Sequence, residues 1–174
     1  NIQSLASDLD NSEGEGQIWF NSTSNDYKTI VKVAGAWATG HSINTTRKTL
    51  GGFGTQTAAL IVGGEPGPGA LTETYDGTTW TEVGDLTTAA PNFGGACGTT
   101  TAGLCISGDR GGISVLNEEW NGTSWTESGD VNAGRKEAGG LGTQTAAIFA
   151  GGNPSSALSE TYDGSTWTEG NNIN

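Results

Sequence analysis

Short alternations of apolar and polar residues, interrupted by Gly, Pro, Asn and Asp, run along most of the chain. No window repeats apolar residues at intervals of three and four, so the pattern predicts almost no helix. The longest apolar run, AALIV from Ala58 to Val62, has the length of a strand. A membrane-spanning helix needs about 18 apolar residues or more. The pattern therefore predicts an all-β protein of many short strands, without membrane insertion.

One pattern of predicted strands occurs three times in the sequence. The segment GTQTAALIVGG begins at Gly54, and similar segments begin at Gly98 and Gly142, 44 residues apart each time. Each copy contains a Gly-rich strand, an apolar strand, a variable loop and an octapeptide that reads as two further strands joined by a turn. We therefore predict three antiparallel units of four strands each, at about 42–86, 87–130 and 131–170.

The octapeptides YDGTTWTE, WNGTSWTE and YDGSTWTE are each predicted to form a hairpin with two aromatic rings on one face. An Asp-Gly or Asn-Gly pair between β-prone arms is typical of a type I′ turn, which needs positive φ at both central residues. The rings offer a large apolar area to a neighbouring sheet, so we interpret them as core residues. The turn residues are Asp76, Gly77, Asn121, Gly122, Asp163 and Gly164, and the aromatic pairs are Tyr75 with Trp80, Trp120 with Trp125, and Tyr162 with Trp167.

The N-terminal part departs from this repeat. Residues 1–15 are acidic and rich in turn-forming residues, which predicts an extended arm or linker. Residues 16–41 read as a three-stranded β module with strands at QIWFN, YKTIVKV and AWATG. Its last strand, with Trp37, is predicted to take the part of a fourth strand. The chain begins at Asn1 and contains no Met, so we expect a processed product or a piece of a longer polypeptide.

Charge and composition argue against catalysis. The formal net charge of −12 disfavours nucleic acid as a partner, because phosphate binding relies on clustered Lys and Arg. His41 is the single histidine, which is too little imidazole for a copper site, and no nucleophile-elbow sequence accompanies it. Acids recur in register in every unit, which is typical of a solvent-facing edge. The sequence predicts no enzyme, no cofactor and no metal site. The recurring acids are Glu73, Glu82, Glu118, Glu127, Glu160 and Glu169.

Two pairs of basic residues occupy equivalent places. Arg47-Lys48 and Arg135-Lys136 precede the first strand of their units, 88 residues apart. We expect them at one end of the molecule, either as charge balance on an acidic protein or as a ligand face that includes Arg110.

Two cysteines replace apolar residues of the other units. Cys97 stands where the other units have Phe or Leu, and Cys105 stands where they have Ile or Phe, so both are predicted to face the core. With the hairpin centred on Thr101, the two side chains would lie opposite each other. They form either a disulfide or two buried thiols.

The units resemble kelch repeats, which build β-propellers. The shared pattern is a Gly pair after the apolar strand, then a Tyr and a Trp, although the second unit has Ser107-Gly108-Asp109 at the Gly pair. The resemblance implies a kelch-like β-propeller of four-stranded blades. Three arrangements stay open: a small four-bladed ring with residues 17–40 as an abbreviated blade, an excerpt of a longer array, or a ring or stack completed by neighbouring subunits. The matching positions are Gly63, Gly64, Tyr75 and Trp80; Gly108, Trp120 and Trp125; and Gly151, Gly152, Tyr162 and Trp167.

More narrowly, GTQTAALIVGG followed by TETYDGTTWTE is similar to kelch-like arrays in tail-fibre and particle-decoration proteins of tailed phages. This resemblance implies a non-enzymatic structural protein of the extracellular virion. Its partners would be copies of itself, other virion proteins and host-surface glycan. Two alternatives stay open, namely a subunit of a microbial extracellular filament and a secreted or surface-bound carbohydrate-binding module. If a glycosylating host secretes the chain, the sequons at Asn21, Asn44 and Asn121 would carry sugar.

Overall fold

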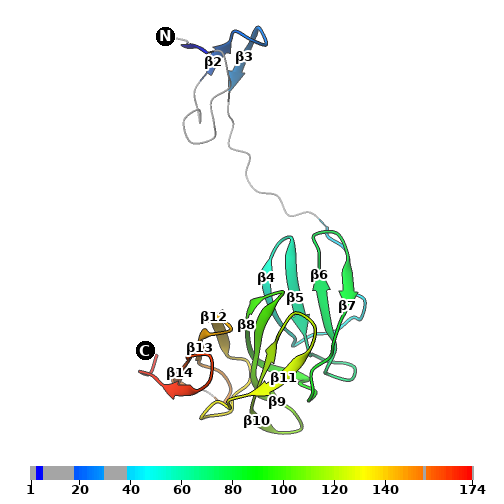
Figure 1. Ribbon diagram of the computed structural model, residues 1–174, viewed down its shortest axis with the longest axis vertical. Helices are drawn as coiled ribbons and strands as arrows, with labels where there is room; N and C mark the ends of the chain where they lie inside the picture. The colour runs from blue at the N-terminus through cyan, green and yellow to red at the C-terminus, as the bar shows by residue number, and fades with distance from the viewer. Residues whose placement is uncertain (1–2, 6–17, 30–38, 155, 174) are drawn as a thin grey trace. The chain divides into compact units, whose positions relative to one another are not determined.

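The computed structural model describes residues 3–5, 18–29, 39–154 and 156–173. These residues form strands, turns and loops with no helix among them, which confirms the all-β prediction. The chain divides into two compact units, Asn1–Thr39 and Gly40–Asn174 (Figure 1). A search of the described residues for a helix long and apolar enough to cross a membrane finds none.

The described strands of the first unit form a three-stranded sheet. Strand β1 (Gln3–Leu5) runs parallel to β2 (Ile18–Asn21), which is antiparallel to β3 (Asp26–Thr29). Strand β1 lies inside the segment interpreted as an extended arm. The rest of that arm, residues 6–15, and the expected strand through Trp37 lie outside the described residues.

The second unit contains three antiparallel sheets of four strands (Figure 1). In each sheet the strands are hydrogen-bonded in chain order, because a short turn or loop joins each strand to the next. Sheet I consists of β4 (Gly51–Thr55), β5 (Ala58–Val62), β6 (Thr72–Tyr75) and β7 (Trp80–Glu82). Sheet II consists of β8 (Asn92–Thr99), β9 (Ala102–Asp109), β10 (Ile113–Trp120) and β11 (Trp125–Ser128). Sheet III consists of β12 (Gly139–Thr143), β13 (Ala146–Ala150), β14 (Ser159–Tyr162) and β15 (Trp167–Glu169).

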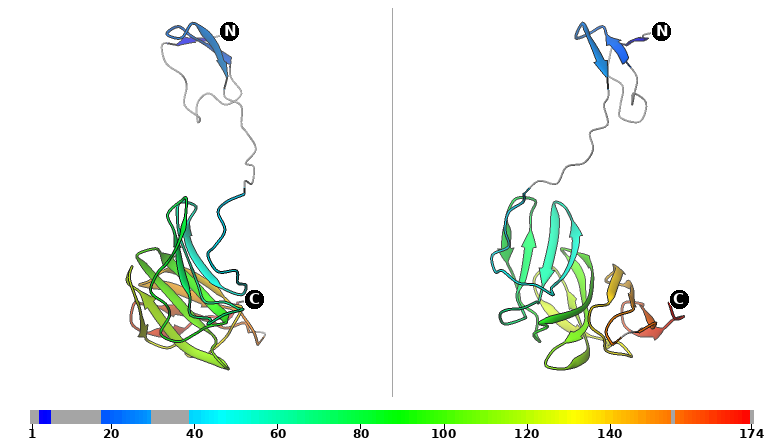
Figure 2. Two further views of the ribbon diagram at one scale, coloured as in Figure 1. Left: turned by 90° about the vertical axis from the view of Figure 1, so that its right-hand side faces the viewer. Right: turned by 180° about the vertical axis from the view of Figure 1, so that it is seen from behind.

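The first strands of the three sheets pack closely, with β8 against both β4 and β12 (Figure 2). Glycine permits this approach. A Cβ atom on Gly95 would lie 2.9 Å from the backbone nitrogen of Gly140, and a Cβ atom on Gly140 would lie 2.6 Å from the backbone nitrogen of Ala96. Side chains at these positions would push the first strands apart, so the Gly-rich composition of β8 and β12 follows from their packing.

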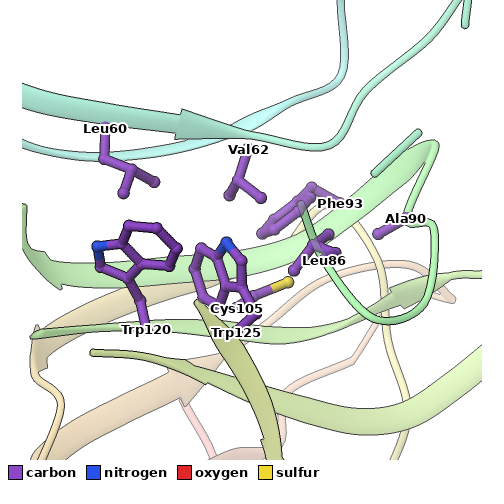
Figure 3. Close-up of a cluster of buried hydrophobic side chains, with 8 residues drawn as sticks. All are labelled: Leu60, Val62, Leu86, Ala90, Phe93, Cys105, Trp120 and Trp125. Atoms are coloured by element: carbon purple, nitrogen blue, oxygen red, sulfur yellow. The ribbon is translucent and has the colours of Figure 1, made fainter. Parts of the chain in front are cut away.

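Between sheets I and II lies the first of two apolar clusters. Leu60 and Val62 of β5 point toward the indole rings of Trp120 and Trp125 (Figure 3). Leu86, in the segment that connects the two sheets, completes the contact. Burying an aliphatic or aromatic side chain of this size contributes about 1.5–3 kcal/mol, so this cluster is a principal source of cohesion between the sheets.

The second cluster lies between sheets II and III and is built from equivalent positions. Leu104 and Ile106 of β9 pack with Tyr162 and Trp167 of sheet III, and Val131 of the connecting segment is buried with them. In both clusters the earlier sheet supplies aliphatic side chains from its second strand, and the later sheet supplies a pair of aromatic rings. Sheets I, II and III therefore stack in one direction through two contacts of the same kind.

The octapeptide turns differ from the predicted type I′ turn. Tyr75 pairs with Trp80, so four residues connect β6 and β7 where a type I′ hairpin has two. Positive φ occurs at the Gly of each turn but not at the preceding Asp or Asn. Asp76 contributes its side chain instead: its Oδ1 atom accepts the backbone N–H groups of Thr78 and Thr79 at 2.8 and 2.7 Å. Asn121 and Asp163 accept the corresponding two N–H groups in their own turns.

Candidate functional site

Three arginines that the sequence offered either as charge balance or as part of a ligand face have side chains buried in ion pairs. The ligand-face alternative is wrong for these arginines, because each guanidinium group contacts a buried glutamate from the third strand of a sheet. The pairs are Arg47 Nη2 with Glu73 Oε1 at 2.8 Å, Arg110 Nη1 with Glu118 Oε1 at 2.9 Å, and Arg135 Nη1 with Glu160 Oε1 at 2.9 Å.

Each buried carboxylate also binds the segment that enters its sheet. Glu73 accepts the backbone N–H of Asn44 at 2.7 Å, Glu118 that of Thr87 at 2.8 Å, and Glu160 that of Asn132 at 2.7 Å. Charge-assisted hydrogen bonds of this kind are among the stronger ones in proteins. The three glutamates therefore hold the connecting segments against the sheets.

The prediction that the recurring glutamates face the solvent is correct for only half of them. Glu73, Glu118 and Glu160 are buried, whereas their register partners on the fourth strands, Glu82, Glu127 and Glu169, are exposed. Like charges facing each other across a strand pair are unfavourable. An arginine beside each buried acid compensates its charge.

The lysines that follow two of these arginines remain accessible. Lys48 lies 3.3 Å from Glu65 and is largely exposed, and Lys136 Nζ lies 3.4 Å from Asp109 Oδ2. The hydrogen bond from Lys136 is the main reason why the pKa of Asp109 is lowered. Successive side chains in an extended segment point to opposite sides, so each arginine is buried while the lysine after it stays accessible.

The thiols of Cys97 and Cys105 are free and lie on opposite faces of sheet II. The prediction that they lie opposite each other is wrong, because Cys97 pairs with Leu104 and Cys105 pairs with Ala96. The hairpin is centred between Thr100 and Thr101, and a shift of one residue turns a side chain to the other face. Burial raises the pKa of Cys97 to about 11 and that of Cys105 to about 12, so both thiols are protonated at neutral pH.

The octapeptide rings form close pairs whose surroundings differ between sheets. The ring centroids are 4.9 Å apart in Tyr75–Trp80, 5.3 Å in Trp120–Trp125 and 4.8 Å in Tyr162–Trp167. The pairs of sheets II and III are buried against the preceding sheet, whereas the pair of sheet I is half-buried. Tyr75 lies opposite Ala59, next to Leu60, so its ring points away from sheet II.

A cavity of about 350 Å³ lies along the first strands of the three sheets. Gly-rich backbone of β4, β8 and β12 lines most of it, together with Thr49, Asn92 and Glu137. Among its lining residues, Glu137 is the sole ionisable side chain. The cavity can offer hydrogen bonds to a ligand, and its lining contains a single carboxylate, so no pair of carboxylates is formed there.

The remaining candidates from the sequence are the single histidine and the three sequons. His41 is exposed, and no group of three or more His, Cys, Asp or Glu side chains in the described part of the chain is arranged to hold a metal ion. Asn44 and Asn121 are exposed, whereas Asn21 is buried and its side chain accepts the backbone N–H groups of Thr23 and Ser24.

A surface that the sequence analysis did not single out is the outer face of sheet III. Leu141 and Ile148 form a register pair that points away from sheet II, and both are exposed. They occupy the positions that Phe53 and Leu60 occupy in sheet I. The sequence shows that these two positions are apolar in every unit. Only the order in which the sheets stack shows that the face of sheet III has no neighbouring sheet within this unit.

No model of a known protein family matches the chain, and a search of curated proteins finds no match.

Proposed function

We propose that this chain is a non-enzymatic structural protein of a phage virion, either a segment of a tail fibre or a decoration of the particle. Its three sheets act as blades of a kelch-like, propeller-type array that provides a rigid β scaffold. The virion assignment rests on the similarity of the repeated segments to phage arrays. The scaffold role rests on how the repeated residues are used.

The observation that carries the scaffold role is the set of three buried Arg–Glu pairs. An active site usually breaks a repeat once, at one position. Here Glu73, Glu118 and Glu160 have the same role in all three sheets, because each pairs with an arginine and binds the segment that enters its sheet. The two cysteine thiols, which would be nucleophiles as thiolates, are buried and protonated.

Immunogold electron microscopy tests the virion role. Antibodies raised against the purified chain should label phage particles whose genome encodes it, on the tail or on the capsid. Peptides of the chain should also appear when those particles are purified and analysed by mass spectrometry. A chain that is found only in host cells or in particle-free medium would contradict the proposal.

A second candidate function is a subunit of an extracellular filament. The favouring observation is that sheets I and III are the two ends of a stack that continues in one direction, which suits end-to-end addition. The carbohydrate-binding alternative loses the support of its arginines, because Arg47 and Arg135 are buried in ion pairs, whereas Lys48 and Lys136 remain accessible.

A further inference from the structure

The two ends of the stack expose the two halves of one contact. Inside the Gly40–Asn174 unit, each sheet-to-sheet contact joins an aliphatic face of one sheet to an aromatic face of the next. Among the three sheets of this unit, none follows the aliphatic face of sheet III and none precedes the aromatic face of sheet I.

The aliphatic face of sheet III consists of Leu141, Ile148 and Ile173, which are 65%, 45% and 49% exposed. Ile148 is equivalent to Leu60 and Leu104, which are fully buried in the two internal contacts.

Ile173 is equivalent to Leu86 and Val131 of the connecting segments. Its backbone N–H bonds to the carbonyl of Ala157, as that of Leu86 bonds to Ala70 and that of Val131 to Val115. Leu86 and Val131 are buried in the internal contacts, so Ile173 has the same backbone arrangement without the covering sheet.

The aromatic face of sheet I consists of Gln56, Tyr75 and Trp80. The rings of Tyr75 and Trp80 stack on each other and are half-buried, whereas their counterparts in sheets II and III are buried beneath the preceding sheet. Sheet I therefore already holds its aromatic pair in the stacked arrangement, and no sheet of this unit covers the pair.

Two polar groups on this face also lack the bonds of their counterparts. Gln144 of sheet III donates to the carbonyls of Gly103 and Trp120 in sheet II at 3.2 and 2.7 Å. Gln56 occupies the same position in sheet I, is exposed, and makes no such bond within the described part of the chain.

The same holds for the indole of Trp80. Trp125 Nε1 donates to Thr72 Oγ1 across the contact between sheets I and II at 2.9 Å. The Trp80 indole, its counterpart, has no hydrogen-bond partner among the described residues, and the counterpart of Thr72 in sheet III is Ser159.

We propose that the aromatic face of sheet I in one copy of the chain packs against the aliphatic face of sheet III in a second copy. Trp80 Nε1 of one copy then donates to Ser159 Oγ of the next, and Gln56 reaches backbone carbonyls of β13 and β14 across the contact. The occupant is a second copy because the two faces carry the same aliphatic and aromatic positions that form the two contacts within the chain. Such a head-to-tail contact either closes into a ring or continues as a fibre.

Analytical ultracentrifugation of the full chain tests this contact. We expect oligomers that grow with protein concentration. Trp80→Glu and Ile148→Glu should each weaken self-association at least about tenfold, because each places an unpaired charge in an apolar contact. Ile113→Glu is the matched control: Ile113 is 48% exposed, close to the 45% of Ile148, but it belongs to sheet II and lies on neither face. This control should leave self-association unchanged.

A mixing experiment tests whether the contact is head-to-tail. Trp80→Glu retains the sheet III face and Ile148→Glu retains the sheet I face, so an equimolar mixture should form one-to-one dimers although neither variant dimerises alone. If circular dichroism shows that Trp80→Glu is unfolded, Gln56→Glu at an exposed turn replaces it.

Three outcomes would overturn the proposal. They are a wild-type chain that stays monomeric up to about 1 mM, self-association of Ile148→Glu by itself, and a mixture that stays monomeric. A monomer is also the expected outcome if residues 1–39 of the same chain cover the two faces. The inference deepens the proposed structural role but fails independently of it, since self-association is measured on purified protein and the virion role on particles.

Discussion

Arg110 forms an ion pair with Glu118 in sheet II, but it comes from a different part of its unit than the equivalent arginines, Arg47 and Arg135, do in theirs. The two arginines of sheets I and III precede the first strand, whereas Arg110 follows β9, and its Nη1 atom lies 2.9 Å from Glu118 Oε1. At the position equivalent to Arg47, sheet II has Pro91. The buried ion pair is thus retained in sheet II although its arginine comes from another part of the unit, which indicates that the pair itself matters for the fold.

Breaking this pair should destabilise the protein strongly. Glu118→Gln leaves the buried Arg110 guanidinium without a counter-charge, which typically costs about 3–5 kcal/mol in the free energy of unfolding. Glu127→Gln is the matched control, because Glu127 faces Glu118 in the register of the same sheet but is exposed. The control should change stability by less than about 0.5 kcal/mol. Urea unfolding measures both, and equal effects would contradict the structural role of the pair.

Two tryptophans at equivalent positions should respond differently to the same substitution. Trp125 Nε1 donates to Thr72 Oγ1 in a buried hydrogen bond, whereas Trp167 Nε1 is buried without a partner in the described residues. Trp125→Phe should therefore cost about 1 kcal/mol more than Trp167→Phe, since both lose similar ring area but only the first loses a bond. A larger loss for Trp167→Phe in urea unfolding would contradict this assignment.

The octapeptide turns should make stability depend on acid pH. The backbone N–H of Thr166 and the hydroxyl of Ser165 lower the pKa of Asp163 to about 2, and the N–H of Thr79 leads the causes that lower the pKa of Asp76. A lowered pKa adds stability above the unfolded value of about 3.9 and loses it as the pH falls through the folded pKa.

Replacing both acids by asparagine tests the origin of this dependence. Asn121 performs the same role in sheet II with a neutral amide. The double variant Asp76→Asn, Asp163→Asn should therefore keep its turns and lose less stability than wild type between about pH 4 and pH 2. Denaturation midpoints measured across that range check this, and parallel pH profiles of the two proteins would exclude these carboxylates as the cause.

Neither thiol should react while the protein is folded. Cys97 and Cys105 are buried, and burial raises the pKa of each thiol to about 11 and about 12, so little thiolate is available to an aromatic disulfide reagent. Two thiols per chain should react rapidly after unfolding in urea without a reductant. Detection of no reactive thiol after unfolding would instead demonstrate a disulfide.

The errors of the sequence-based predictions have a common cause. The hairpin between β8 and β9 is centred half a residue before Thr101, and that small difference places Cys97 and Cys105 in separate clusters. Likewise, spacing along the chain could pair Arg47 with the equivalent Arg135 but could not show that Arg110 performs their role in sheet II. Both features depend on three-dimensional geometry, because the turn fixes the register of the hairpin and side-chain packing selects the arginine that reaches Glu118.

The sequence by itself determined the all-β character, the three similar segments of strands and the pairing of aromatic rings across each octapeptide hairpin. These features are local, because turn chemistry, strand alternation and strand length are properties of neighbouring residues. Tertiary structure alone decided which glutamates are buried, which face each cysteine occupies, and that Leu141, Ile148 and Ile173 remain exposed. Burial depends on what packs against a residue, and equivalent residues of a stack differ in that respect when one sheet is internal and another is at the end.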